Sequence, residues 1–99
     1  MNPYRIEFDP RAVRDGAKLP VFVRRRVLNK LEFLRVAPFR SHPGVRVKEL
    51  AELRGVWRFH LSADVRVYYT VEGDMLWVVM IERSLGVTKK TLSELRRRT

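Results

Sequence analysis

Four side chains on two neighbouring segments have the types and the spacing to act on a phosphodiester. Arg58 and His60 lie two residues apart, and so do Arg66 and Tyr68. Cleavage of RNA through its own 2′-hydroxyl needs a group that deprotonates this hydroxyl, a cation that neutralises the phosphorane, and a group that protonates the 5′-oxygen leaving group. Arginine suits the second task. His60 suits the first or the third, because the reference pKa of histidine lies near neutrality.

Further polar residues near these segments extend the candidate site. Arg83 lies just past the last apolar segment, and Lys48 and Glu49, which precede Trp57, are weaker candidates for proton transfer. The candidates for catalysis are Arg66, His60, Arg83, Lys48 and Glu49. The candidates for contacts with RNA are Arg58, Tyr68, Arg54, Lys89 and Lys90. The competing interpretation is a solvated surface, on which Tyr68 packs against Arg58 as a cross-strand pair.

Charge is the property of this chain that points most directly to a partner. The 99 residues carry 21 Lys and Arg against 11 Asp and Glu, and the formal net charge is +10. Most of the cations are arginines, whose planar fork matches phosphate. We therefore expect a polyanionic partner, RNA or DNA, or an acidic protein that covers the surface. A general compositional preference for arginine is the alternative cause.

The same composition excludes several classes of function. Cysteine is absent, which removes disulfides, thiolate zinc sites and cysteine nucleophiles. The two histidines lie far apart in sequence and no glycine-rich phosphate loop is present, so we expect no metal and no cofactor. The longest apolar run, residues 75–81, is far shorter than the about 20 residues of a membrane span. No signal peptide is visible, and we expect a single cytoplasmic domain over residues 1–99 with no membrane contact.

The first part of the chain predicts a strand and two helices. Residues 4–8 alternate as a short strand, and a short helix follows from Asp9-Pro10 to Gly16. A longer helix is expected between Pro20 and Pro38. Its apolar stripe for the core is Val23, Val27, Leu31 and Leu34, widened by Leu28.

The second part predicts an antiparallel meander and a C-terminal helix. Three strands are expected at residues 56–62, 65–71 and 75–81, joined by turn-like gaps. The spacing from Thr91 to Glu94 is that of a capping box, which predicts a short basic helix or tail to Arg98. The fold class is therefore α+β, with the order β-α-α-β-β-β and the two N-terminal helices packed on one face of the sheet.

The pairing of the first two meander strands decides which side chains share a face. A three-residue loop over residues 62–64 gives three apolar pairs: Leu61 with Val65, Phe59 with Val67, and Trp57 with Tyr69. The other face then holds His60 opposite Arg66, and Arg58 opposite Tyr68. A two-residue turn would mix apolar and basic side chains on both faces, because a one-residue slip reverses every side chain. We therefore predict one apolar face for the helices and one basic face open to a ligand, with Arg66 exposed on it.

The third meander strand is apolar on both sides. Along it, one set of side chains (Met75, Trp77, Val79 and Ile81) alternates with another (Leu76, Val78 and Met80). A strand of this kind is usually central in its sheet and covered on both faces. We expect the N-terminal strand to flank it.

A longer motif surrounds the candidate residues. It contains Lys48-Glu49-Leu50, then Leu-Arg-Gly-Val-Trp-Arg-Phe-His-Leu at 53–61 and Val-Arg-Val-Tyr-Tyr at 65–69. This motif resembles the signature of the RelE/ParE superfamily of small toxins from bacterial toxin–antitoxin modules, and the order of elements agrees over nearly the whole chain. By this resemblance Arg66 stands at a near-constant arginine, Lys48 or Glu49 at the polar position before the glycine turn, and Arg83 near the arginine after the last strand.

The resemblance implies a compact toxin that is held inactive by a cognate antitoxin protein with an acidic or amphipathic segment. A heterotetramer with this antitoxin is one assembly that it allows. Members of the RelE type enter the ribosomal A site and cut mRNA, whereas members of the ParE type inhibit DNA gyrase. Many RelE-type nucleases carry a histidine or tyrosine soon after the last strand, and residues 82–86 contain neither.

Three interpretations therefore stay open. The first is a ribosome-dependent, metal-independent mRNA endonuclease that inhibits translation. The second is a gyrase inhibitor without nuclease activity. The third is a degenerate module that only binds nucleic acid.

Overall fold

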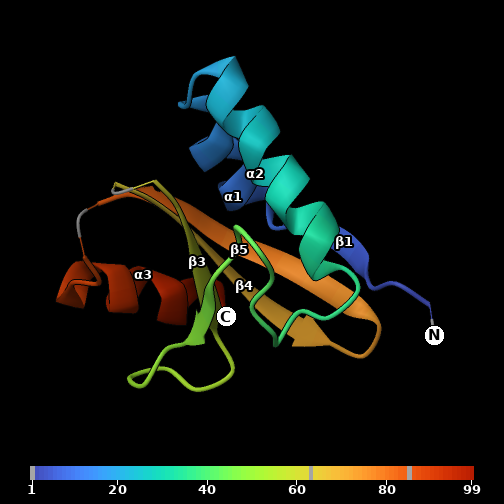
Figure 1. The fold of residues 1–99 in the computed structure, drawn as a ribbon. Helices are drawn as coiled ribbons and strands as arrows, with labels where there is room; N and C mark the ends of the chain where they lie inside the picture. Colours follow the sequence, from blue (N-terminus) through green and yellow to red (C-terminus); the bar gives the residue numbers. More distant parts are fainter. Residues whose placement is uncertain (1, 63, 85) are drawn as a thin grey trace.

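The computed structural model describes residues 2–62, 64–84 and 86–99, and over them the chain forms one sheet and three helices (Figure 1). The elements in chain order are β1 (Arg5–Phe8), α1 (Pro10–Ala17), α2 (Val21–Leu34), β2 (Val47–Glu49), β3 (Trp57–Ser62), β4 (Val65–Glu72), β5 (Met75–Arg83) and α3 (Lys89–Arg98). The predicted α+β class and the predicted order of elements are confirmed, with β2 as an addition. Strand β2 was not predicted, because a strand of three residues is too short to show alternation.

The strands lie in the order β1-β5-β4-β3-β2. All neighbours are antiparallel except β1, which pairs in parallel with β5 over four residues, from Arg5 opposite Met75 to Phe8 opposite Val78. This confirms that the N-terminal strand flanks the all-apolar strand. The result is a mixed sheet in which β5 has neighbours on both sides and apolar cover on both faces.

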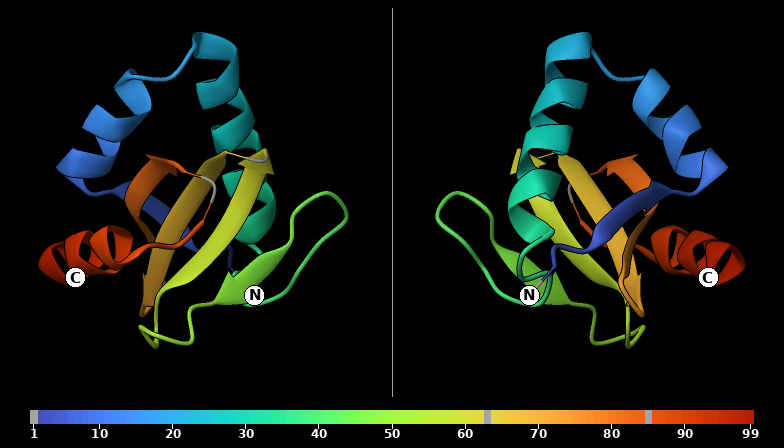
Figure 2. Two further views of the ribbon diagram at one scale, coloured as in Figure 1. Left: turned by 90° about the vertical axis from the view of Figure 1, so that its left-hand side faces the viewer. Right: turned by 90° about the vertical axis from the view of Figure 1, so that its right-hand side faces the viewer.

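Helices α1 and α2 cover one face of the sheet (Figures 1 and 2). Asp9 caps α1 by accepting from the Arg11 backbone N–H, which matches the predicted start. The core under these helices joins Val27, Leu31 and Leu34 of α2 to sheet residues that include Phe59, Val67 and Tyr69. Leu28 does not widen the stripe as predicted, because it lies on the flank of α2 and is 50% exposed.

The predicted register of β3 and β4 is confirmed at Trp57, Arg58, Phe59 and His60. It is wrong at the next position, where Ser62 rather than Leu61 pairs with Val65 because the ladder shifts between His60 and Ser62. This irregularity keeps the Leu61 side chain buried in the core. Part of the predicted loop, residue 63, lies outside the described residues.

A second bulge lies in β5, where Tyr68 pairs with Met80 and Tyr69 with Val78, so Val79 is the extra residue. Because of this extra residue, the predicted alternation of the β5 side chains between the two faces of the sheet is wrong from Met80 onward. Ile81 joins the core under α1 and α2, together with Val78, whereas Met80 and Val79 face the other side. A strand that is apolar at every position gives no pattern from which such a shift could be read.

Helix α3 lies against the sheet face opposite α1 and α2 (Figure 2). It starts at an N-cap on Thr88 with a capping box to Thr91, three residues before the box predicted from Thr91. Its Leu95 is buried with Tyr68, Val79 and Met80 in a second, smaller core. The expectation of a basic face open to a ligand is therefore wrong in part, since α3 covers the part of that face around Tyr68 and Met80. No helix within the described ranges is long and apolar enough to span a membrane.

Candidate functional site

The sheet arranges the candidate residues in two rows on the face that α3 covers in part. Cross-strand partners place Lys48, Arg58, Tyr68 and Met80 side by side from β2 to β5. The adjacent row holds His60, Arg66 and Glu82. Paired residues point to the same face of a sheet, so the structure brings together five sequence-predicted residues, which we call the basic face: Lys48, Arg58, His60, Arg66 and Tyr68.

A hollow of about 370 Å³ opens on this face. Arg58 and Arg66 line it from the inner strands β3 and β4, and the exposed Lys48 lines it from the edge strand β2. Gly86 and Val87, which precede α3, line the opposite side. The other lining residues are Glu49, Leu50, Ala51 and Glu52. The hollow thus places three cations around one open space, as a site for a phosphate group would require.

Arg66 lies deeper than the sequence suggested. It is only 6% exposed, and its Nη1 donates to the backbone carbonyl of Ser84. The predicted exposure is wrong because Ser84, just after β5, accepts from this side chain, and Gly86 and Val87 line the same hollow beside it. Burial lowers the effective dielectric around the guanidinium, so its charge acts more strongly on a nearby phosphate than a solvated one would.

Arg58 and His60 form a pair on β3. An Arg58 Nη1–H lies in short contact with His60 Nε2, which makes this ring nitrogen the acceptor. Burial first, and then the charges of Arg58 and Arg66, hold the pKa of His60 below its ordinary 6.5. His60 is therefore a neutral imidazole at pH 7, suited to accept a proton. Within the described part of the chain, Arg58 Nε is buried and has no hydrogen-bond partner.

Glu82 is a residue of this site that the sequence reasoning missed. It is the Cα partner of Arg66 on β5, and its carboxylate accepts from the Tyr68 hydroxyl at 3.2 Å and from Thr91 Oγ1 at 2.9 Å. Burial and the Glu82 charge raise the pKa of Tyr68, so this phenol stays protonated. Tyr68 is fully buried, which keeps its ring from stacking on an exposed base. The position of Glu82 opposite Arg66 follows from the register of β5, which the sequence did not specify.

The remaining residues that the sequence predicted for the site are not part of the basic face. They are Glu49, Arg54, Arg83, Lys89 and Lys90. Glu49 lines the hollow but accepts from the Gly55 backbone N–H at 2.8 Å, which fixes the turn at Gly55, whose φ is +90°. Arg54 is 82% exposed beside Glu49. Arg83 pairs with Asp64 at 3.4 Å.

The remaining candidates lie at the edges of the site. Arg83 is the cross-strand partner of the core residue Val65, so it leaves the sheet on the face opposite Arg66. Lys89 and Lys90 are exposed in the first turn of α3. Over residues 2–62, 64–84 and 86–99, no three His, Asp or Glu side chains are close enough to hold a metal ion.

Comparison with known proteins agrees with this architecture. Residues 6–84 match the family model described as "ParE toxin of type II toxin-antitoxin system, parDE". The chain is a toxin of the RelE/ParE family. A search of curated protein sequences finds no significant match. The predicted family membership is thereby confirmed, and with it the general function of a toxin from a type II toxin–antitoxin system.

Solved structures share the fold of this RelE/ParE toxin. A double arginine-to-alanine mutant of the E. coli toxin RelE in the free state has a TM-score of 0.75 at 23% identity and covers 98% of both chains. The archaeal RelE–RelB complex from Pyrococcus horikoshii has a TM-score of 0.70 at 22% identity, over 88% of this chain and 100% of the other. The YoeB/ParE toxin from Agrobacterium tumefaciens has a TM-score of 0.69 at 15% identity, over 80% and 96%.

Proposed function

We propose that this toxin is a metal-independent endoribonuclease that cuts mRNA on the ribosome and so inhibits translation in the cytoplasm. The observation that carries the proposal is the juxtaposition on the basic face of a neutral imidazole, His60, with the buried guanidinium of Arg66 and the half-buried guanidinium of Arg58. Arg58 Nε, which has no partner among the described residues, is a donor available to an anion. Likeness to RelE structures supports the fold on which this chemistry rests.

The proposed reaction starts with binding of the scissile phosphate between Arg58 and Arg66. Because a phosphate oxygen is a stronger acceptor for Arg58 than an imidazole, its binding draws the guanidinium away from His60 and frees Nε2. His60 then takes the proton of the 2′-hydroxyl, whose oxygen forms a bond to phosphorus. The two guanidinium groups stabilise the charge of the phosphorane.

The second half of the reaction breaks the bond between phosphorus and the 5′-oxygen. Lys48, exposed at the rim of the hollow, is the proposed donor of the proton to this leaving oxygen. The products are a 2′,3′-cyclic phosphate and a 5′-hydroxyl end. No step requires a metal ion, because the arginines supply the positive charge.

Cell-free translation followed by primer extension tests this proposal. We expect new 5′ ends within translated codons, which depend on the ribosome and persist in EDTA at concentrations that leave ribosomes intact. Arg58→Ala should abolish them, and Arg54→Ala, which removes the same charge from an exposed side chain, should leave them in place. Transcripts that stay whole while the wild-type toxin is present would refute the proposal.

Inhibition of DNA gyrase is the second candidate, favoured by the match to the ParE family model. It is also favoured by the absence of histidine and tyrosine from the sequence after Tyr69. A supercoiling assay with purified gyrase separates the two candidates, since a nuclease leaves supercoiling unchanged. If neither assay responds, a steep salt dependence of RNA binding would identify the third alternative, a module that only binds nucleic acid.

We also propose a cognate antitoxin that supplies an acidic, amphipathic segment. The net charge of +10 supports an acidic partner, and complexes of RelE with RelB are among the structural matches. An apolar groove of about 280 Å³ between α1 and α2, lined in part by Val13 and Leu28, offers such a segment a site. Co-purification of an untagged acidic protein encoded by the neighbouring reading frame is the test. A wild-type chain that is obtained alone in high yield and without toxicity would count against it.

A further inference from the structure

Strand β5 continues well beyond the end of its parallel neighbour β1. The last pair of this ladder is Phe8 with Val78, and the Asp9 backbone N–H donates to the Val78 carbonyl. Past this point no described strand lies on the β1 side of β5. The Val79 carbonyl and the Ile81 N–H would therefore have no ladder partner on that edge, and unpaired backbone groups are costly when buried.

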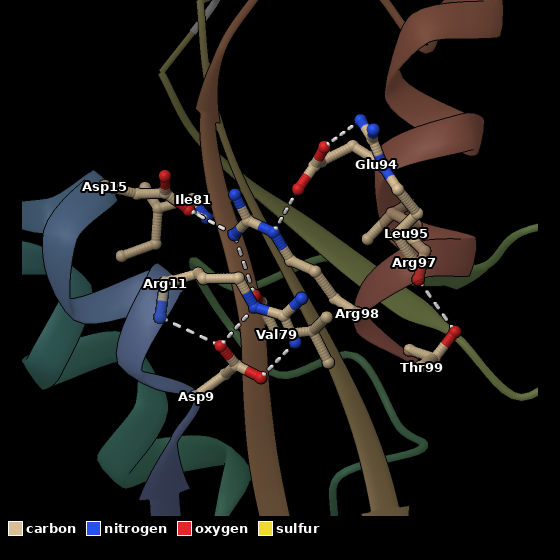
Figure 3. Close-up of polar contacts among 10 residues, drawn as sticks. All are labelled: Asp9, Arg11, Asp15, Val79, Ile81, Glu94, Leu95, Arg97, Arg98 and Thr99. Atoms are coloured by element: carbon tan, nitrogen blue, oxygen red, sulfur yellow. Dashed lines mark hydrogen bonds and ion pairs between the residues drawn. The ribbon is translucent and has the colours of Figure 1, made fainter.

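Two oppositely charged side chains take the place of the missing strand (Figure 3). The Asp15 carboxylate at the end of α1 accepts from the Ile81 N–H at 3.1 Å. Arg98, in the last turn of α3, donates to the Val79 carbonyl at 3.0 Å and to the same Asp15 oxygen at 2.7 Å. Its Nε donates to Glu94 at 2.8 Å. We call this group of Asp15, Glu94 and Arg98 the clamp.

The clamp is well shielded from solvent. The Arg98 side chain is only 10% exposed and the Asp15 side chain 17%. Helix α3 contains just two apolar side chains, Leu92 and Leu95. Because so little apolar area holds the helix, its polar anchors decide where it lies.

The other end of α3 is anchored on the proposed RNA site. Thr91 closes the capping box of α3 and donates to Glu82, the cross-strand neighbour of Arg66. Ser84, whose carbonyl accepts from Arg66, lies in the connection that leads into this helix. The position of α3 is therefore tied to the carbonyl that accepts from the Arg66 guanidinium and to the carboxylate of its cross-strand neighbour.

We propose that Arg98 is a positioning residue for the RNA-cleavage site: by clamping the end of α3 to β5 and α1, it holds Glu82 and Ser84 where they orient Arg66. The role rests on the proposed nuclease function. Arg98 itself lies at the opposite end of α3 from Thr91 and has no contact with the hollow, so its effect reaches the reaction only through Arg66. Small displacements of a positioned cation are costly, because its catalytic effect depends on geometry.

The test compares Arg98→Met with Arg97→Met in the full-length toxin. Both substitutions remove one positive charge from the same turn of α3, but Arg97 is exposed and contacts only Glu94 among the clamp residues. We expect Arg98→Met to lower the single-turnover cleavage rate at saturating ribosome by about 10²-fold. The ribosome concentration at half-saturation should match that of Arg97→Met, since the loss of charge is equal. Arg98→Lys should recover part of the rate, because an ammonium lacks the fork that serves three acceptors.

Two further measurements separate positioning from unfolding. Asp15→Asn combined with Arg98→Met removes both shielded charges and leaves Glu94 paired with Arg97, so this variant should melt cooperatively and still cleave slowly. The NMR signal of the Arg66 Nε–H should shift in Arg98→Met and stay in place in Arg97→Met. Equal cleavage rates in the two single variants, or an unmoved Arg66 signal, would overturn the proposal. A wild-type toxin that cuts no transcript refutes the nuclease function instead, and the Arg66 signal alone then decides whether Arg98 positions this side chain.

Discussion

Replacement of Arg66 by alanine should affect both the stability and the proposed activity of this toxin. Arg66 is almost fully buried, and its guanidinium donates to the Ser84 carbonyl. Alanine would leave this carbonyl without that donor, which costs about 1–3 kcal/mol for a buried group. A domain of this size gains or loses about 4–8 °C in Tm per kcal/mol, so the midpoint should fall by about 8–16 °C for a loss near 2 kcal/mol.

The same substitution removes a cation aimed at the phosphorane. Loss of one such group lowers the rate of the chemical step by about 10²–10³-fold. Arg66→Lys keeps the charge but not the two-pronged geometry, so it should recover only part of the rate. Calorimetry gives the stability, and single-turnover cleavage on programmed ribosomes gives the rate at a temperature where each variant is folded.

Arg54→Ala is the matched control for Arg66→Ala. It removes the same charge from a side chain that is 82% exposed, so its Tm should stay within about 3 °C of the wild type. A folded Arg66→Ala variant that cleaves as fast as the wild type would refute the role of this arginine in the reaction. An unchanged Tm would refute the buried contact with Ser84.

Three more outcomes are expected. Leu31→Ala, in the core under α2, should destabilise by about 2–5 kcal/mol in urea titrations, whereas Leu28→Ala on the exposed flank should cost far less. The Arg11 guanidinium lowers the pKa of Asp9 from 3.8 to about 2. The Asp9 carboxylate therefore stabilises the fold above about pH 4, and this stabilisation is lost as the pH falls towards 2. In acid titrations of the free energy of unfolding, Asp9→Asn should make the dependence on pH in this window less steep. His60→Gln should remove the acidic limb of the cleavage profile, whose inflection lies below 6.5 in the wild type. Arg58→Met should raise the pKa of the His60 ring in an NMR titration of the free toxin, because one cation beside the imidazole is lost.

The sequence by itself determined the type and order of most elements and the residues that share a face. Alternation with period two, together with the polar turns, settled the pairing of Arg58 with Tyr68 and of His60 with Arg66. The stripe of Val27, Leu31 and Leu34 settled which side of α2 is buried. These features depend on local spacing, and local spacing is visible in a sequence.

Tertiary structure alone decided how the basic face is covered. The bulge at Val79 has no signature, because β5 is apolar at every position around it. With two leucines in ten residues, α3 has too weak an apolar stripe to predict its place. Contacts between distant residues place it instead, Arg98 with Asp15 at one end and Thr91 with Glu82 at the other. Together with the register of β5, these contacts bury Arg66 beside Glu82. The sequence does not predict them, because no periodicity relates the polar groups that the fold brings together.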